Sequence, residues 1–288
     1  MTYQNIPSRR RLMLAGAGAI VATAIKPQQA LGAVHSNKSL TMPPAPVPSA
    51  QSCANTGDLI GAAEIWAAPT FSEAGFARTW QYDSAFYARL ETWLEFWFLN
   101  TPNEWVFPIR LSGYGAYVNR NDDCSSMHNF GRALDISRIH VTSGGTEIEA
   151  VNARYDLWRT TTGEQLTSHL KRYWATSASL HYHFRHVLTY LYNTEHWNHF
   201  HIDNQLSESS NSTFSTGSFI QVQHVQACCR YIWGYSTAID GQWGPQTESH
   251  SQAALARMGR AGSLASSQSN WLEFNKASLR FGTGADSY

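Results

Sequence analysis

Residues 198–203 read NHFHID and alternate polar with apolar side chains, which is the pattern of a half-buried β-strand. Successive strand side chains face opposite sides, so His199 and His201 share one face while Phe200 points into the core. Each imidazole has two ring nitrogens that need partners, so two rings side by side are costly to pack without a purpose. A fold that contains this strand must supply such partners, and a metal ion is one of them.

An upstream motif adds further side chains that can bind a metal. Residues 125–137 read SSMHNFGRALDIS, in which His128 and Asp135 stand seven positions apart. Histidine and aspartate are good zinc ligands, and a catalytic zinc site uses three protein ligands plus water. His128, Asp135 and one histidine of the strand can provide these three, which leaves the other histidine for proton transfer. The two motifs together predict a metal site.

The histidine-x-histidine pattern alone is a weak signal, because His181 and His183 repeat it. That pair lies in a helical context with His186, where positions i and i+2 diverge. We interpret these three histidines as helix-surface or satisfied core residues. The isolated histidines receive the same structural interpretation: His35, His140, His169, His224 and His250.

The central part of the chain predicts an α+β domain. Apolar residues recur at helical spacing behind Asp83 and Ser84, either of which can cap a helix. These apolar residues are Phe86, Leu90, Trp93, Leu94 and Trp97. Residues 105–118 read as β-structure interrupted by glycines, and residues 163–193 read mainly as helix. Helices combined with a small sheet that carries polar side chains indicate the α+β class.

Composition is that of a globular protein and argues against nucleic acid as a partner. Aromatic residues make up 13% and charged residues 15% of the 288 residues. The formal net charge is zero, but residues 1–33 contain four bases and no acid. Removing these four leaves 17 bases against 21 acids, a net charge of −4. A mildly acidic body without a basic stripe is not typical of nucleic-acid binding.

Residues 1–33 have the pattern of an export signal. A basic cluster precedes a small-residue apolar run and a small-residue cleavage pattern. The run is too short, and too rich in glycine and alanine, to span a bilayer comfortably. The start at Ser8, Arg9 and Arg10 resembles the twin-arginine signal. We expect export to the periplasm, cell wall or exterior of a bacterium, without stable membrane insertion after signal removal; a cytosolic basic arm is the alternative.

Export permits disulfides, and the chain has an even number of cysteines. Cys53, Cys124, Cys228 and Cys229 allow three pairings, which all stay open. If Cys53 pairs with Cys124, the adjacent Cys228 and Cys229 form either a strained vicinal pair or two thiols on a helix. The absence of Cys-x-x-Cys spacing argues against a thiolate zinc site.

Two low-complexity stretches divide the chain after the signal. Residues 34–52 form a Pro-rich linker, and residues 207–218 form a Ser/Thr-rich linker. Residues 53–206 between them have a typical domain size. Residues 219–288 form a shorter C-terminal segment.

Both histidine motifs resemble those of known zinc peptidases. SSMHNFGRALDI resembles the Ser-x-His-x-x-Gly-x-Ala-x-Asp signature of the zinc D-Ala-D-Ala carboxypeptidases and dipeptidases. HWNHFHID is similar to their closing segment, most closely in the extensin-like C-terminal domain family and the penicillin-insensitive murein endopeptidases. The resemblance covers roughly residues 105–205. It implies a small zinc-peptidase domain with a short antiparallel sheet and flanking helices. Some relatives, including hedgehog signalling domains, keep zinc with little or no peptidase function.

The resemblance also implies roles for individual residues. It places His128, Asp135 and His201 at the zinc-ligand positions. His199 falls on the position of the catalytic base, and His196 falls on that of a supporting histidine in the murein endopeptidases. The implied cofactor is Zn²⁺, which brings the pKa of bound water to about 7 and polarises a scissile carbonyl.

Three further residues are expected to bind the substrate, and one position departs from the family pattern. The resemblance implies that Ser126 orients the loop of the first motif, and Ser126 belongs to the expected substrate-binding set. Arg120 or Arg132 could bind a substrate carboxylate bidentately, with a surface ion pair as the alternative for either. Many relatives carry Glu or Asp where this chain has Asn198, which cannot act as a base. Proton transfer is therefore assigned to His199.

The C-terminal segment predicts a helical unit. Apolar side chains recur at helical spacing, and Thr247 can cap a second helix. The first helix carries Val222, Val225, Cys229 and Ile232. The segment resembles three-helix peptidoglycan-binding modules with a DGxxGPxT signature, matched by Asp240, Gly241, Gly244, Pro245 and Thr247. The apolar residues expected next are replaced by ESHSQ, and a helical cap on the central domain is the alternative interpretation.

These observations lead to one expected function and two rivals. We expect an exported zinc peptidase that hydrolyses peptidoglycan stem peptides or cross-links, as a D,D-carboxypeptidase or endopeptidase, with peptidoglycan as its partner. The first rival is a non-catalytic, zinc-containing wall-binding protein. The second is a metal-independent adhesion protein.

Overall fold

The computed structural model describes residues 59–119, 125–204 and 210–288, and its fold is α+β as predicted. The export signal, the Pro-rich linker, Cys53, Cys124 and Arg120 lie outside these residues. The described helices comprise α3 (Ser84–Leu99), α4 (Tyr155–Trp158), α5 (Gly163–His183), α6 (Phe219–Tyr231), α7 (Pro245–Arg257) and α8 (Gln268–Thr283), with short 3₁₀ helices η1 (Met127–Phe130) and η2 (Thr194–Asn198). None of these helices combines the length and apolar character needed to cross a membrane.

The main sheet is larger than the short antiparallel sheet that the resemblance implies, and it contains both parallel and antiparallel pairs. Its strands are β2 (Glu64–Ile65), β3 (Ala68–Ser72), β5 (Val106–Gly115), β6 (Ala133–Ser143), β7 (Thr146–Asn152), β8 (His186–Leu188) and β9 (Phe200–Asp203). The strand order is β2-β3-β5-β6-β9-β8, and β7 pairs with the second half of β6. The β3–β5 pair is parallel, whereas the other pairs are antiparallel. A separate antiparallel pair joins β1 (Leu59–Ala62) to β4 (Trp80–Asp83).

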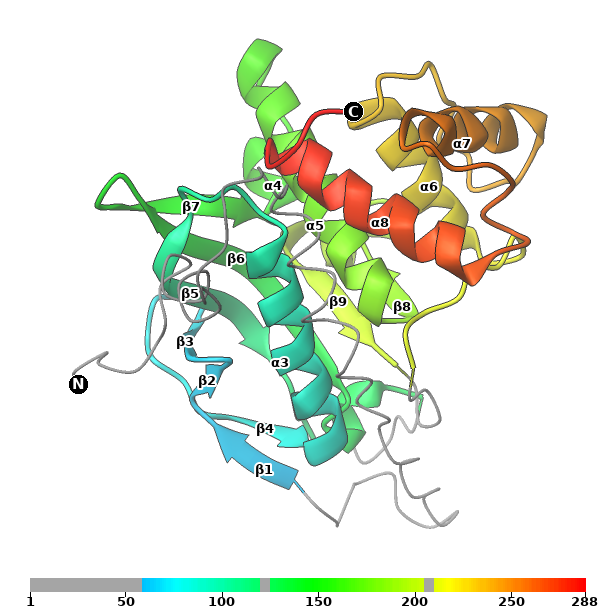
Figure 1. The fold of residues 1–288 in the computed structure, drawn as a ribbon. Helices are drawn as coiled ribbons and strands as arrows, with labels where there is room; N and C mark the ends of the chain where they lie inside the picture. Colours follow the sequence, from blue (N-terminus) through cyan, green and yellow to red (C-terminus); the bar gives the residue numbers. More distant parts are fainter. Residues whose placement is uncertain (1–58, 120–124, 205–209) are drawn as a thin grey trace, which may run out of the picture.

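Helix α3 forms where the apolar periodicity predicts it. Asp83 is its N-cap, and the Asp83 carboxylate accepts a hydrogen bond from the Phe86 amide at 3.0 Å. The five apolar residues of the pattern are each fully buried. Trp93 donates to Ser179 of α5 at 3.0 Å, so α3 packs against α5 as well as the sheet. Figure 1 shows α3 crossing the face of the sheet.

The second predicted helix ends earlier than expected. Residues 163–193 were expected to be mainly helical, but α5 ends at His183 and residues 186–188 form β8. Phe184 takes an extended conformation at the helix end, and β8 pairs with β9. Pairing with a strand that is distant in sequence therefore overrides the local helical pattern. As a result, His186 lies on a strand and is not a helix-surface residue.

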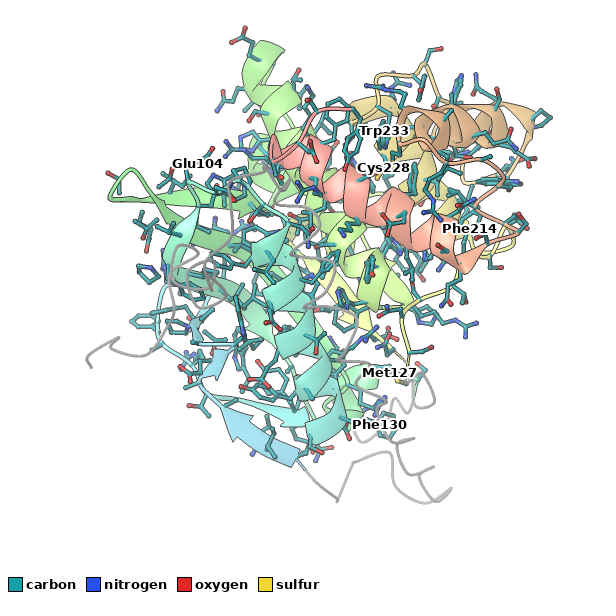
Figure 2. All side chains as sticks on the ribbon, in the orientation of Figure 1. Glu104, Met127, Phe130, Phe214, Cys228 and Trp233 are labelled. Carbon is teal, nitrogen blue, oxygen red and sulfur yellow. The ribbon has the colours of Figure 1, made fainter. Side chains whose placement is uncertain are left out.

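The C-terminal helices share a continuous core with α5. Helix α8 lies along α5, with α6 and α7 beside it (Figure 1). Phe214 stacks on Trp271 of α8 with ring centroids 5.1 Å apart, and Trp233 stacks on Phe274 at 6.3 Å. Phe214 and Trp233 are both labelled in Figure 2. This packing is compatible with a helical cap on the central domain, and wall binding by these helices stays a prediction.

The described end of the Ser/Thr-rich stretch is fixed against this core. Ser212 is only 2% exposed, and its hydroxyl donates to the His181 carbonyl at the end of α5. Trp271 of α8 donates its indole N–H to the Ser212 hydroxyl at 2.7 Å. Residues 210–218 therefore fasten α8 to α5 and do not act as a loose linker.

Two features of the C-terminal segment bear on the sequence-based interpretation: the residue that caps α7, and the state of Cys228 and Cys229. Helix α7 begins at Pro245 with Gly244 as its cap, so the prediction that Thr247 caps it is wrong. Proline suits the first helical position because its missing N–H has no intrahelical partner there. Thr247 is instead buried and accepts a hydrogen bond from Gln226 at 3.1 Å. Cys228 and Cys229 are two free, buried thiols on α6.

Two buried histidines lie at the contact of α5 with α6. The rings of His181 and His224 are 4.1 Å apart between centroids, and both side chains are fully buried. His224 bonds to Ser177 and Asn275, whereas neither ring nitrogen of His181 has a hydrogen-bond partner among the described residues. Burial lowers the pKa of His224 to about 3 and holds the pKa of His181 well below its usual value.

We expect acid to destabilise the packing of α5 against α6. In the unfolded chain the pKa of histidine is about 6.5, whereas burial lowers the pKa of both folded rings. The contribution of these histidines to the free energy of unfolding is therefore fully present above about pH 6.5. It is lost as the pH falls toward the folded pKa. The loss is about 1.4 kcal/mol per pH unit for each histidine. We expect the urea midpoint, measured by far-UV circular dichroism, to fall between pH 7 and pH 5, and to fall less in His181→Phe.

His250→Phe is the matched control, because His250 is half-buried on α7 and bonds to Thr237. If the pH dependence of the His181→Phe variant coincides with that of the wild type, His181 does not contribute to acid sensitivity.

Candidate metal centre

The pairing of β6 with β9 brings the two histidine motifs together. In the antiparallel register Asp135 lies opposite His201, and Ile136 lies opposite Phe200. Phe200 is fully buried and packs on Tyr173 of α5, while His201 stays partly exposed. The alternation predicted from NHFHID is therefore confirmed. Asp135 and His201 project from neighbouring strands on the same side of the sheet.

Glycines allow the backbone to approach this side of the sheet. Gly131 ends η1 with φ 63°, and a Cβ atom there would lie 2.7 Å from the Asp83 nitrogen. At Gly113 a Cβ atom would lie 2.1 Å from the Asp135 carbonyl oxygen. The β5–β6 register shifts on either side of Gly113. Irregular pairing of this kind can re-aim a side chain, here beside Asp135.

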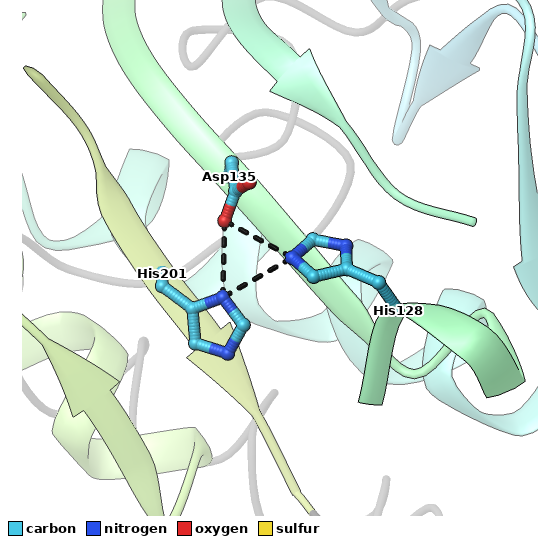
Figure 3. Close-up of side chains that lie close together, drawn as sticks. All are labelled: His128, Asp135 and His201. Carbon is cyan, nitrogen blue, oxygen red and sulfur yellow. Dashed lines mark hydrogen bonds and ion pairs between the residues drawn. The ribbon is translucent and has the colours of Figure 1, made fainter. Parts of the chain in front are cut away.

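His128, Asp135 and His201 form a compact triangle (Figure 3). His201 Nδ1 lies 3.0 Å from Asp135 Oδ1, and His128 Nε2 lies 3.2 Å from His201 Nδ1 and 3.4 Å from Asp135 Oδ1. Zinc binds nitrogen and oxygen ligands at about 2.0–2.1 Å, which puts tetrahedral ligands about 3.3–3.4 Å apart. The three atoms therefore have nearly the spacing that a tetrahedral metal ion requires.

The outer nitrogens of the two rings support the same interpretation. His128 Nδ1 lies 2.5 Å from the Ala116 carbonyl oxygen, which can only accept a hydrogen bond. His201 Nε2 lies 3.2 Å from the Asp203 carboxylate, which accepts as well when ionised. If each neutral ring carries its proton on that outer nitrogen, His128 Nε2 and His201 Nδ1 direct lone pairs at Asp135 Oδ1. Three converging acceptor atoms need a cation between them.

The protonation states of Asp135 and His201 depend on each other. Burial opposes ionisation of Asp135, but contacts with His128 and His201 hold its pKa well below the usual range. Burial would lower the pKa of His201, but its bonds to Asp135 and Asp203 raise that pKa to about 9. A proton on His201 thus satisfies the carboxylates when no metal is bound. A metal ion binds through the same lone pair and must displace this proton.

Two more histidines lie beside the triangle. His199 Nε2 is 3.5 Å from Asp135 Oδ1, and His199 Nδ1 is 2.5 Å from the side-chain oxygen of Asn198. His196 Nδ1 is 2.6 Å from the side-chain oxygen of Asn193. In both pairs the amide oxygen accepts from Nδ1, which leaves Nε2 as the nitrogen with a lone pair. Burial lowers the pKa of His199, and burial together with His199 and His201 lowers that of His196 to about 4.

The predicted substrate-binding residues have different outcomes. Arg132 is fully buried and forms an ion pair with Asp83 at 3.0 Å. This contact argues against the prediction that Arg132 binds a substrate carboxylate, because the Arg132 guanidinium joins the first-motif loop to the N-terminus of α3. Ser126 precedes η1, and its carbonyl accepts from the Asn129 amide at 3.1 Å. Arg120 lies outside the described residues.

Three residues near the centre were not singled out from the sequence. Asp203 follows His201 by two positions, and the alternation of NHFHID could have placed it on the same face. Tyr114 is 44% exposed and contacts the His199 ring, with centroids 5.7 Å apart. Tyr192 is 48% exposed and contacts the His196 ring at 5.3 Å. No spacing rule points to these tyrosines, because only the folded chain brings them to the histidines.

Comparison with known proteins supports one part of the resemblance. Residues 110–213 match the family model described as extensin-like protein C-terminus. The matched range contains the triangle and both additional histidines, and it ends before α6. No curated protein and no solved structure gives a significant match. The likeness to zinc carboxypeptidases and to peptidoglycan-binding modules therefore remains a proposal.

We predict one bound zinc ion per chain. His128→Ala, Asp135→Ala and His201→Ala should each lose it, because each removes one of three converging ligands. Elemental analysis after exhaustive dialysis measures the stoichiometry. His250→Ala is the control and should keep the metal. Full zinc occupancy in all three variants would rule out this set of ligands.

Proposed function

We propose that this protein is an exported zinc peptidase that hydrolyses peptide bonds in peptidoglycan stem peptides or cross-links. The observation that carries the proposal is the triangle of His128, Asp135 and His201, with His199 beside it. The three ligands match the number that catalytic zinc sites use. The similarity of residues 110–213 to the extensin-like C-terminus gives no activity by itself. The metal chemistry is inferred from the side chains, whereas the peptidoglycan substrate is what the resemblance of both motifs to the zinc D-Ala-D-Ala carboxypeptidases implies.

Bound zinc would supply a Lewis acid that acidifies water and polarises the scissile carbonyl. The residues of the chain would do the rest. Ala116 and Asp203 orient the rings of His128 and His201, so His128 Nε2 and His201 Nδ1 already face Asp135 before a metal displaces the proton of His201. This orientation keeps the cost of organising the site low when the metal and substrate bind.

His199 is the proposed general base. Asn198 accepts from its Nδ1, so Nε2 faces the centre. The lowered pKa of His199 keeps the ring neutral and able to take a proton at neutral pH. Asn198 occupies the position where many relatives carry a carboxylate, and here it orients the base. His196, with its ring centroid 5.1 Å from that of His199, is proposed as a supporting residue.

The exposed rings of Tyr114 and Tyr192 border the two histidines and offer a surface for substrate. Each tyrosine combines a large apolar ring with a polar tip, which suits contact with a peptide that is only partly buried. Arg120 remains the proposed partner of a substrate carboxylate, because Arg132 is committed to Asp83. The alternative function, a zinc-containing wall-binding protein without catalysis, uses the same ligands but no base.

Hydrolysis tests the proposal directly. The full chain is incubated with intact sacculi and defined muropeptides, with and without a chelator, and the products are identified by mass. We expect cleavage that the chelator abolishes. His199→Ala should keep zinc and the fold while the rate falls by roughly 10²-fold or more, because it removes proton transfer. His196→Ala should cost less.

The control and the contrary outcomes of this experiment are distinct. His250→Ala should cleave at the wild-type rate. Near-normal turnover in zinc-loaded His199→Ala would place proton transfer elsewhere, and loss of zinc in that variant would make His199 a ligand. A wild-type protein that binds zinc but cleaves neither substrate would favour the non-catalytic alternative.

We also propose that the C-terminal helices bind the cell wall, on the strength of the Asp240–Thr247 signature. In the structure the signature shapes the turn between α6 and α7. Gln226 of α6 donates to the Asp240 carboxylate at 2.7 Å and accepts from the Asp240 and Gly241 amides. Gly241 has φ 73°, and a Cβ atom there would lie 2.1 Å from the Phe219 ring. Phe219, which covers this turn, is 51% exposed and is the proposed contact.

Pull-down of the full chain with purified sacculi tests the wall-binding proposal. We expect the wild type to sediment with the sacculi and Phe219→Ala to lose several-fold in bound fraction, because it removes the exposed ring. Phe76→Ala is the matched control, since Phe76 is 63% exposed in the connection between β3 and β4. Wild-type protein that stays wholly in the supernatant would reject wall binding.

A further inference from the structure

Asp203 connects a proposed metal ligand to a histidine outside the centre. Its two carboxylate oxygens have different partners: Oδ2 lies 3.2 Å from His201 Nε2, and Oδ1 lies 3.0 Å from His186 Nδ1. The strand register explains this arrangement, because Asp203 lies opposite His186 in the β8–β9 pair. The Asp203 side chain is 9% exposed, that of His201 is 14% exposed and that of His186 is 27% exposed. The buried Asp203 side chain therefore links His201 to the more exposed His186.

The carboxylate determines which nitrogen of His201 can face a metal. Asp203 Oδ2 lies 3.2 Å from His201 Nε2, within reach of a hydrogen bond from a ring N–H to a carboxylate oxygen, so this contact favours a proton on Nε2. With the proton on Nε2, the lone pair of His201 is on Nδ1, the atom 3.0 Å from Asp135.

His186 fixes the carboxylate in turn. The terminal torsion of a carboxylate is soft, so each hydrogen bond to one of its oxygens restricts its rotation. The bond from His186 Nδ1 occupies Oδ1 and leaves Oδ2 directed at His201. Histidine ligands of metals commonly donate their second ring nitrogen to a carboxylate, and loss of such a partner weakens metal binding.

We propose that Asp203, held by His186, is a positioning residue that selects Nδ1 of His201 as the metal-binding atom and thereby sets the affinity of the centre for its metal. The inference rests on the proposed metal centre, but it concerns affinity and ligand geometry and not hydrolysis. The competing explanation is that Asp203 only fastens the three-residue strand β8 to β9. That explanation predicts lower stability with unchanged metal affinity.

The zinc dissociation constant separates these explanations. It is measured on the folded full chain by competition with a chromophoric chelator, with far-UV circular dichroism to confirm folding. Asp203→Leu removes both acceptor oxygens, and we expect the constant to rise by about 10- to 100-fold. Asp203→Asn keeps the shape but only one acceptor oxygen, so a rise of about 10-fold is expected. His186→Phe leaves Asp203 in place and should raise the constant only a few-fold.

A spectroscopic readout identifies the atom that binds. Nitrogen-15 spectra of the zinc-loaded protein distinguish a metal-bound from a protonated ring nitrogen, and we expect Nδ1 of His201 to be metal-bound and Nε2 protonated in the wild type. Asp286→Leu is the matched control, because Asp286 also forms an ion pair, with Arg280, in the C-terminal tail. It should leave both the constant and the spectrum unchanged.

Each contrary result has a separate meaning. An unchanged dissociation constant in folded Asp203→Asn, or in folded Asp203→Leu, would overturn the positioning role while leaving the metal centre intact. A His201 bound to zinc through Nε2 in the wild type would overturn it as well. A wild-type chain that binds no zinc would reject the metal centre itself and this inference with it.

Discussion

The antiparallel register of β6 against β9 is the constraint on which the candidate centre depends. It places Asp135 opposite His201 and turns Phe200 into the core. A slip of one residue would reverse every side chain of β9, exposing Phe200 and burying both histidines of NHFHID. The hydrophobic contact of Phe200 with Tyr173 therefore protects the geometry of the polar face as well as the core.

A second constraint joins the first-motif loop to the rest of the fold. Asp83 caps α3, pairs with Arg132 and donates its amide hydrogen to the Gly131 carbonyl. Its interactions thus place η1, and with it His128, relative to the helix that covers the sheet. Because Arg132 and Asp83 are both buried, loss of Arg132 would leave the Asp83 carboxylate without its ion-pair partner, which is more costly than the pair is stabilising.

The sequence predicted the elements whose pattern is local. The period of α3, the extended residues of β5 and the alternation of β9 are all visible in short windows, and each is confirmed. The end of α5 was missed because β8 exists only through its pairing with β9. For the centre, residue types and spacing predicted that His128, Asp135 and a histidine of NHFHID would meet, and the resemblance to zinc peptidases assigned His201 to this set. They could not predict that Arg132 is buried or that Tyr114 and Tyr192 border the histidines, because these facts depend on long-range packing.

The fixation of residues 210–218 between α5 and α8 has a consequence for how such a protein would work on a polymer. Two units on a flexible tether sample many separations, so an anchored enzyme can search the material around its anchor. Here Ser212 bridges the end of α5 to Trp271 of α8, and the C-terminal helices share the core of the central domain. If these helices hold the wall, the centre stands at one set distance and angle from the attachment point. The protein would then reach only those bonds that lie at this distance and angle from its attachment point.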